Sequence, residues 1–278
     1  MKRVLLVVCM LTTGSLCRAQ APSLGTAGSF AVLGGTAVTC TSGVITGDVG
    51  ISPGSAVTNT GCTIAGTVHV NDLAATTAHT DFLNAYAVLN DNVRTPCTQT
   101  ISTAAFTDNV PVLGPLPPGV YCFPAAVTFT RTTLTLDGTT NPNGIWIFRV
   151  AAALTGTGLQ VVMANGGQAC NVFWTVGADA TLTTAAALPL LFQGNLLAGS
   201  ISTTGGALVG RALANAAVTM TNTNVNGVCA LVDQVKAGCK NDDDDKDDDD
   251  KDRDHKHHKH HKDHKDDKDD NERKDHKD

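Results

Sequence analysis

The sequence Ile45-Thr-Gly-Asp-Val-Gly-Ile-Ser52 returns 19 residues later as Ile64-Ala-Gly-Thr-Val-His-Val-Asn71. Both copies fit the pattern I-x-G-x-V-x-I/V-S/N, in which apolar side chains alternate with small or polar ones. Alternation with a period of two is typical of a β-strand that buries one face. A strand that recurs at a short fixed interval is typical of a solenoid, in which each turn of chain packs on its neighbours.

A second series of short motifs lies further along the chain. Each motif places an apolar residue between two small residues, most of which carry a hydroxyl, and the last three begin 19 residues apart. Because side chains alternate across a strand, we expect the central residue to point inward and the hydroxyls outward. We therefore predict a mainly β fold, a parallel β-solenoid, with an antiparallel sandwich as the alternative. The motifs are Thr133-Leu-Thr135, Ala153-Leu-Thr155, Thr181-Leu-Thr183, Ser200-Ile-Ser202 and Thr219-Met-Thr221.

One segment breaks the strand pattern and predicts a helix over about 72–94. Asn71-Asp72 can cap its start, and it ends before Pro96 because the residue before a proline disfavours the helical region. About 20 helical residues span roughly 30 Å, enough to lie along several coils. We interpret His79 as a residue of the polar face. The apolar stripe, at spacings of three to five, is Leu73, Ala78, Phe82, Tyr86, Leu89 and Val93.

Residues 1–19 have the layout of a secretory signal peptide. Lys2 and Arg3 precede an apolar stretch, and small residues lead up to a cleavage site after Ala19. No later stretch approaches the roughly 18 to 20 apolar residues of a membrane span. We therefore expect a secreted, extracellular protein whose body is residues 20–239.

Seven cysteines remain after such a cleavage. Export favours disulfides, and an odd number leaves one thiol unpaired. Spacing favours the pairs Cys40–Cys62 and Cys97–Cys122, whereas the lack of a C-x-x-C spacing disfavours a metal site. The seven are Cys40, Cys62, Cys97, Cys122, Cys170, Cys229 and Cys239.

Charge is distributed very unevenly along the chain. Residues 20–239 hold only five Lys/Arg and eight Asp, whereas the whole chain holds 20 Lys/Arg and 26 Asp/Glu. A nucleic-acid partner would need a basic patch, which the body lacks. Scattered single Asp residues also argue against paired catalytic carboxylates, so we expect no enzyme. By contrast, 35 of these 220 residues are Thr.

Residues 240–278 form an Asp/Lys/His-rich tail with almost nothing apolar to bury, and we expect this tail to be disordered. Its clustered histidines have the spacing of a weak site for Zn²⁺, Ni²⁺ or Cu²⁺, and no other cofactor is expected. The alternative is a solvated polyampholyte that only aids solubility. The candidate ligands are His255, His257, His258, His260, His261 and His264.

Over about residues 24–230 the sequence resembles the microbial ice-binding, antifreeze-like proteins. The most specific motif is N-G-x-Q-A-C-N-V-F-W at 165–174. The resemblance implies a right-handed, discontinuous β-solenoid of roughly triangular section, with one helix packed along one face and another flat face that meets ice. The other matching stretches are 24–33, 45–50, 116–121, 134–138, 144–148, 192–198, 210–214 and 217–221.

A flat array of Thr would suit such a surface, because β-branched side chains are stiff and lose little rotamer entropy on docking. We therefore predict a secreted monomer that adsorbs to ice and inhibits ice growth and recrystallisation. The alternative is an extracellular adhesion or matrix module that binds polysaccharide or a cell surface and carries a metal-binding tail. The candidate face is Thr133, Thr135, Thr155, Thr181, Thr183, Ser200, Ser202, Thr219 and Thr221. The alternative is the other outward face, which would include Thr184, Thr203 and Thr204.

Overall fold

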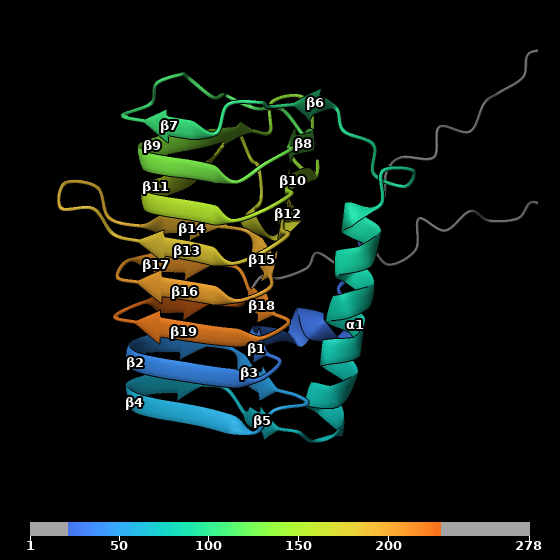
Figure 1. The fold of residues 1–278 in the computed structure, drawn as a ribbon, viewed down its shortest axis with the longest axis vertical. Helices are drawn as coiled ribbons and strands as arrows, with labels where there is room; N and C mark the ends of the chain where they lie inside the picture. The colour runs from blue at the N-terminus through green and yellow to red at the C-terminus, as the bar shows by residue number, and fades with distance from the viewer. Residues whose placement is uncertain (1–21, 229–278) are drawn as a thin grey trace, which may run out of the picture. The chain divides into compact units, whose positions relative to one another are not determined.

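A computed structural model describes residues 22–228, which form stacked coils of short strands with one long helix alongside (Figure 1). Every pairing between the named strands is parallel, which excludes the antiparallel sandwich. The first sheet has nine strands. In spatial order they are β5 (Val68–Val70), β3 (Asp48–Ile51), β1 (Phe30–Gly34), β18 (Ala212–Ala214), β15 (Asn195–Ala198), β12 (Val172–Val176), β10 (Trp146–Val150), β8 (Gly119–Phe123) and β6 (Gln99–Thr100).

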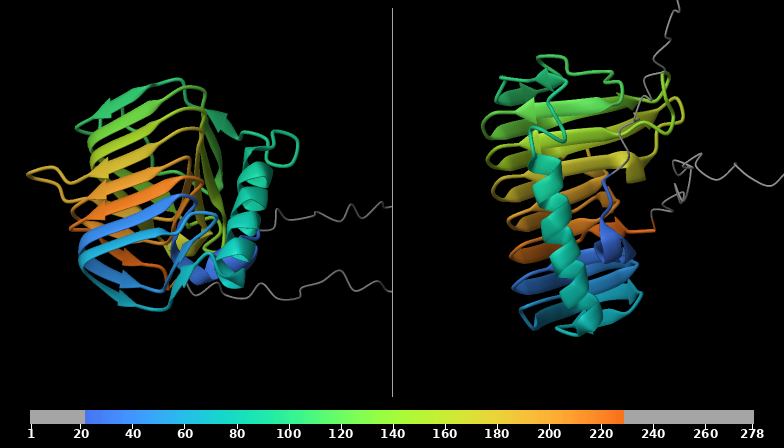
Figure 2. Two further views of the ribbon diagram at one scale, coloured as in Figure 1. Left: turned by 60° about the horizontal axis from the view of Figure 1, so that its bottom comes forward. Right: turned by 90° about the vertical axis from the view of Figure 1, so that its right-hand side faces the viewer.

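The second sheet has eleven strands, and four of them are long enough to form two sides of a coil. These long strands turn a corner at residues with positive φ, such as Gly43 in β2 and Gly158 in β11. Each coil therefore has three sides, as Figure 2 shows. The strands are β13 (Ala180–Thr183), β16 (Ile201–Thr204), β19 (Ala217–Thr221), β2 (Ala37–Thr46), β20 (Asn224–Asn226), β17 (Ala207–Val209), β14 (Leu191–Gln193), β11 (Leu154–Ala164), β9 (Val127–Asp137) and β7 (Ala105–Thr107), with β4 (Ala56–Ala65) paired to β2.

The order of the strands is discontinuous in sequence. β1 lies between β3 and β18, so the first coil of the chain packs against the last. Figure 1 shows this as blue strands directly below orange ones. The helix α1 (Leu73–Asn90) then carries the chain from β5, at one end of the stack, toward β6 at the other.

The core fills the interior of the coils. Trp174 is fully buried and stacks on Phe148 with ring centroids 4.1 Å apart. Alternate residues of each strand point into this core, as the period of two predicts: Leu134, Leu182 and Met220 are all fully buried. Of the two short 3₁₀ segments, η1 (Gly25–Ser29) packs beside α1, where Ala27 is buried near Phe82, and η2 (Ala169–Asn171) directly precedes β12.

The helix packs on the outer side of the nine-stranded sheet. Its Phe82 and Leu89 are buried against outward residues of the sheet such as Phe173 and Leu213. Asp72 caps its start by accepting a hydrogen bond from the Ala75 N–H at 2.8 Å.

Three details of the expected helix differ in the structure. It ends at Asn90 rather than near residue 94, because Asp91 has an extended backbone and its carboxylate accepts the Val93 N–H at 2.7 Å. Leu73 and Val93, the two ends of the expected stripe, are 83% and 89% exposed. His79 is half-buried beside Phe82, with ring centroids 5.7 Å apart, so it does not belong to a fully polar face.

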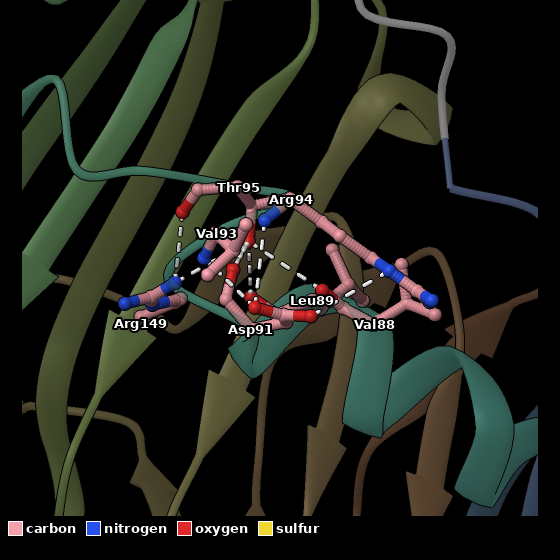
Figure 3. Close-up of polar contacts among 7 residues, drawn as sticks. All are labelled: Val88, Leu89, Asp91, Val93, Arg94, Thr95 and Arg149. Carbon is pink, nitrogen blue, oxygen red and sulfur yellow. Dashed lines mark hydrogen bonds and ion pairs between the residues drawn. The ribbon is translucent and has the colours of Figure 1, made fainter.

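Arg149 ties the end of the helix to the sheet. As Figure 3 shows, its guanidinium lies against the loop that follows α1, where it donates to the Thr95 carbonyl at 2.8 Å. It also donates to the Asn92 side chain. Burial lowers the pKa of Arg149. Nearer the middle of the stack, just before β18, the Arg211 guanidinium donates to the Gly28 carbonyl at 2.7 Å. Burial lowers the pKa of Arg211 to about 10.

The structure confirms both expected disulfides, Cys40–Cys62 and Cys97–Cys122. Cys170 is disulfide-bonded as well. The predicted signal peptide, the tail and its histidines lie outside the described residues. Within residues 22–228, no helix has the length and apolar character needed to cross a membrane.

Candidate functional site

One side of the stack carries two straight columns of residues, all but one of which bear a hydroxyl, and we call this side the threonine face. It is formed by β7, β13, β16 and β19 together with the first halves of β2, β4, β9 and β11, the strands that face the viewer in Figure 1. Strand register places one residue of each strand in each column. The first column is Ala105, Thr128, Thr155, Thr181, Ser202, Thr219, Thr39 and Thr58; the second is Thr107, Thr130, Thr157, Thr183, Thr204, Thr221, Thr41 and Thr60.

The columns point outward because the residue between them on each strand points into the core. Leu182 and Met220 are fully buried in this central position, and their flanking threonines are exposed or half-buried. Neighbouring residues of a column are about 4.8 Å apart, and the two columns are separated by about 6.7 Å along the strand. The result is a regular, flat grid of methyl and hydroxyl groups.

The grid is stiff. Threonine has two heavy atoms on Cβ, which restricts its side-chain rotation, and close packing within a column restricts it further. The Thr183 hydroxyl donates to the Thr157 hydroxyl at 3.2 Å, a contact between neighbouring strands of the second column. The surface is therefore preorganised, and little rotamer entropy remains to be lost on binding.

The threonine face carries no charge among the residues described. Its nearest charged pair is Arg131 with Asp108, at a corner of the stack, where Nε and Oδ1 are 2.6 Å apart. The Arg131 guanidinium lowers the pKa of Asp108, so this pair stays ionised over the ordinary pH range. This charged pair thus lies at the rim of the threonine face and not on it.

The neighbouring side of the stack, which we call the mixed face, is a useful contrast. It is formed by β14, β17, β20 and the second halves of the long strands. Its two outward columns mix amide, aliphatic and hydroxyl side chains without a repeat. They are Thr133, Gln160, Leu191, Ala207, Asn224, Val44 and Thr63, then Thr135, Val162, Gln193, Val209, Asn226, Thr46 and Ala65.

Six of the nine residues predicted from sequence lie together on the threonine face: Thr155, Thr181, Thr183, Ser202, Thr219 and Thr221. The other three do not. Thr133 and Thr135 lie beyond the corner of β9, on the mixed face, where they pair with Gln160 and Val162. Ser200 precedes β16, and its carbonyl accepts the Ala180 N–H at the corner of a coil.

The grouping of nine residues in one face was wrong for two reasons: β9 turns a corner at Arg131, before Thr133 and Thr135, and the coils differ in length. The 19-residue spacing aligned Ser200 with Thr181, whereas the strand register aligns Ser202 with Thr181. A motif with an apolar central residue does not describe Thr155-Gly-Thr157 or Ser202-Thr-Thr204, whose inward residues are Gly156 and Thr203. Of the alternative face, Thr204 lies in the second column of the threonine face, whereas Thr203 is buried in the core.

Most of the threonine face was missed by the sequence analysis. Residues 39–41 and 58–60 both read T-x-T and are 19 residues apart, so the same spacing rule applied to them could have found them. Thr128-Phe-Thr130 has the expected apolar centre as well. Thr107 could not have been found in this way, because the residue two positions before it is Ala105 and not Thr. Only its register with Thr130 places it in the second column.

Comparison with known proteins gives consistent results. A family model described as ice-binding-like matches residues 32–226. The chain is 35% identical over 220 residues to an ice-binding protein of Nostoc sp. (strain HG1), covering 77% of each chain. It is 30% identical over 216 residues to an ice-binding protein of Flavobacterium frigoris (strain PS1), covering 71% of this chain and 73% of the relative.

Solved structures agree. The crystal structure of an ice-binding protein from the Antarctic ascomycete Antarctomyces psychrotrophicus superposes with a TM-score of 0.64 at 30% identity, covering 74% of this chain and 98% of that one. The crystal structure of an ice-binding protein from an Antarctic biological consortium superposes with a TM-score of 0.63 at 31% identity, covering 74% of this chain and 90% of that one. The family and these relatives are described as ice-binding, which agrees with the expectation that this chain is not an enzyme. The chain belongs to the ice-binding-like family.

Proposed function

We propose that this protein is secreted, adsorbs to ice through the threonine face, and inhibits ice growth and recrystallisation. The observation that carries the proposal is the register of the threonine face, in which the second column is Thr at every strand from Thr107 to Thr60. The names of its relatives support ice as the ligand.

The grid suits a ligand that is itself a repeating lattice of water. Threonine methyls favour ordered water over the face, and the hydroxyls tie that water to the protein. Contacts mediated by water are nearly as favourable in enthalpy as direct hydrogen bonds. A charged side chain would hold its hydration shell in an arrangement unlike ice, and the threonine face has none among its residues.

Adsorption explains inhibition of growth. Protein molecules fixed on the surface force the advancing ice front to bulge between them, and a curved front is less stable than a flat one. Further freezing is therefore opposed without any chemical reaction.

The repeat also favours ice over the polysaccharide alternative. A glycan site needs side chains placed around individual sugar hydroxyls, usually with aromatic or amide groups, whereas the threonine face presents one repeating pair of residues. The mixed face does carry amides, such as Gln160 and Asn226, but in no periodic order.

Ice recrystallisation and crystal shaping by the purified mature chain test the proposal. Thr183 lies near the centre of the threonine face and Thr135 lies on the mixed face, and both are half-buried threonines on strands. We expect Thr183→Tyr to need at least a tenfold higher concentration to arrest coarsening, because the ring lifts the face off a flat lattice. Thr135→Tyr is the matched control and should behave as the wild type. Wild-type protein that neither shapes ice nor arrests coarsening would overturn the proposal.

A further inference from the structure

The two ends of the stack are finished differently. At the β6–β7 end, the chain between β7 and β8 runs across the last coil and buries Leu116 over the core. At the other end, β4 pairs only with β2 and β5 pairs only with β3 among the described residues. Figure 1 and both views of Figure 2 show no helix or strand of residues 22–228 stacked beyond β4 and β5 at this end.

The uncovered end exposes core side chains. Val57, Ile64, Val68 and Val70 continue core columns whose preceding residues, such as Val49 and Ile51, are at most 2% exposed. Val68 and Val70 are nevertheless 42% and 44% exposed. This surface, which we call the open end, resembles a hydrophobic core cut across its middle.

The open end is also rimmed by free strand edge. The ten residues of β4 and the three of β5 present roughly 40 Å of strand edge, at about 3.3 Å per residue. At the corner of β4 the Asn59 side chain already binds the Cys62 N–H and C=O, and the straight parts of the strands on either side of this corner offer the groups for further pairing. Exposed edges are usually blunted by Lys, Pro, a bulge or a covering segment. Residues 56–70 contain no Lys, Arg, Asp, Glu or Pro.

We propose that the open end binds the open end of a second copy of this chain. A two-fold axis perpendicular to the threonine face would pair the first half of β4 with itself in antiparallel order, and the second half of β4 with β5 of the other copy. Such an isologous contact is self-complementary by symmetry. It places Val57, Ile64, Val68 and Val70 of the two copies together, with no like charges opposed.

A second copy fits better than an unrelated strand. A single added strand would pair with β4 but leave the apolar centre open, whereas a second open end has the same outline, the same free edges and the same valines. About ten main-chain hydrogen bonds could form, the number found in a typical stable interface. This dimer replaces the monomer expected from the sequence.

The dimer would also extend the threonine face, a consequence that rests on the proposed function. Thr58 and Thr60 lie on β4, at the end of both columns. Because outward residues alternate with a period of two, antiparallel pairing in the correct register keeps the threonines of both copies on one surface. Two threonine faces would become one continuous grid of twice the length.

Sedimentation or light scattering of the mature chain over a concentration series tests the dimer without ice. We expect wild-type protein to double its mass as the concentration rises. Val68→Lys places an ammonium in the open end and should remain monomeric. Val44→Lys is the matched control, because Val44 is 45% exposed but lies on the mixed face, and it should dimerise as the wild type does.

Circular dichroism establishes that each variant is folded. If Val68→Lys does not fold, Val70→Lys on the same edge strand, β5, takes its place and should also stay monomeric, because Val70 is 44% exposed in the open end. Wild-type protein that stays monomeric at the highest concentration overturns the proposal, as does a dimer that persists in the folded edge variant. Dimerisation without any effect on ice would leave this proposal standing and refute the proposed function alone.

Discussion

Replacing Phe82 by Ala separates the role of the helix from that of the threonine face. Phe82 is 1% exposed and lies in the layer between α1 and the nine-stranded sheet, together with Leu33, Phe173 and Leu213. The helix covers the sheet on a side of the stack that the threonine face does not share. Stability and ice activity should therefore respond differently to this substitution.

The size of the effect follows from the burial of the ring. Truncating a buried Phe to Ala costs about 3–5 kcal/mol, which includes the lost transfer free energy and the cavity that remains. In a protein of this size, 1 kcal/mol lowers Tm by roughly 2–4 °C, so we expect a decrease of about 10 °C. Leu83, the next residue, is 42% exposed, and Leu83→Ala should cost less than about 1 kcal/mol.

Thermal and urea denaturation followed by circular dichroism measure the stability, and recrystallisation assays near 0 °C measure the activity. Phe82→Ala should remain folded in the cold and arrest ice growth at the wild-type concentration. A Tm no lower than that of Leu83→Ala would refute the packing argument. Loss of ice activity in the folded Phe82→Ala protein would show that the helix side takes part in binding.

Three further substitutions test other parts of the structure. Burial lowers the pKa of His79, so below about pH 6.5 this residue binds more protons in the unfolded chain than in the folded one. Wild-type stability, measured by urea titration, should therefore fall from pH 7 to pH 5, and His79→Gln should lose this dependence. Thr203 has a buried hydroxyl with no hydrogen-bond partner among the described residues. Thr203→Val should therefore raise the unfolding free energy by about 1 kcal/mol. An unfolding free energy below that of the wild type would show that the hydroxyl does have a partner. Replacing Cys40 and Cys62 by Ser removes a cross-link between residues 22 apart and should lower the unfolding free energy by about 3 kcal/mol in the same titrations. An unchanged urea midpoint would contradict this prediction.

Local rules predicted the elements of this fold well. The alternation of apolar and hydroxyl residues depends only on neighbouring positions, so the inward role of Leu182 and the outward role of Thr181 could be read directly. The Asp72 cap and the spacing of the two disulfides are local signals of the same kind.

The alignment of strands between coils could not be predicted in the same way. Register depends on the length of every corner, and those lengths vary: Thr181 to Ser202 spans 21 residues, but Ser202 to Thr219 spans 17. The contact between β1 and β18 joins residues about 180 apart in sequence and leaves no local pattern. The complete threonine face is visible only once these registers are known.

Adsorption of labelled protein to a single ice crystal tests the central claim most directly. The sequence has no lysine between Lys2 and Lys236, so an amine-reactive dye leaves the threonine face unmodified. We expect wild-type protein and the Thr133→Tyr/Thr135→Tyr double variant to accumulate on the crystal, and Thr181→Tyr/Thr219→Tyr to remain in the liquid. Equal adsorption by the two double variants, or loss of binding only in Thr133→Tyr/Thr135→Tyr, would contradict the assignment of ice binding to the threonine face.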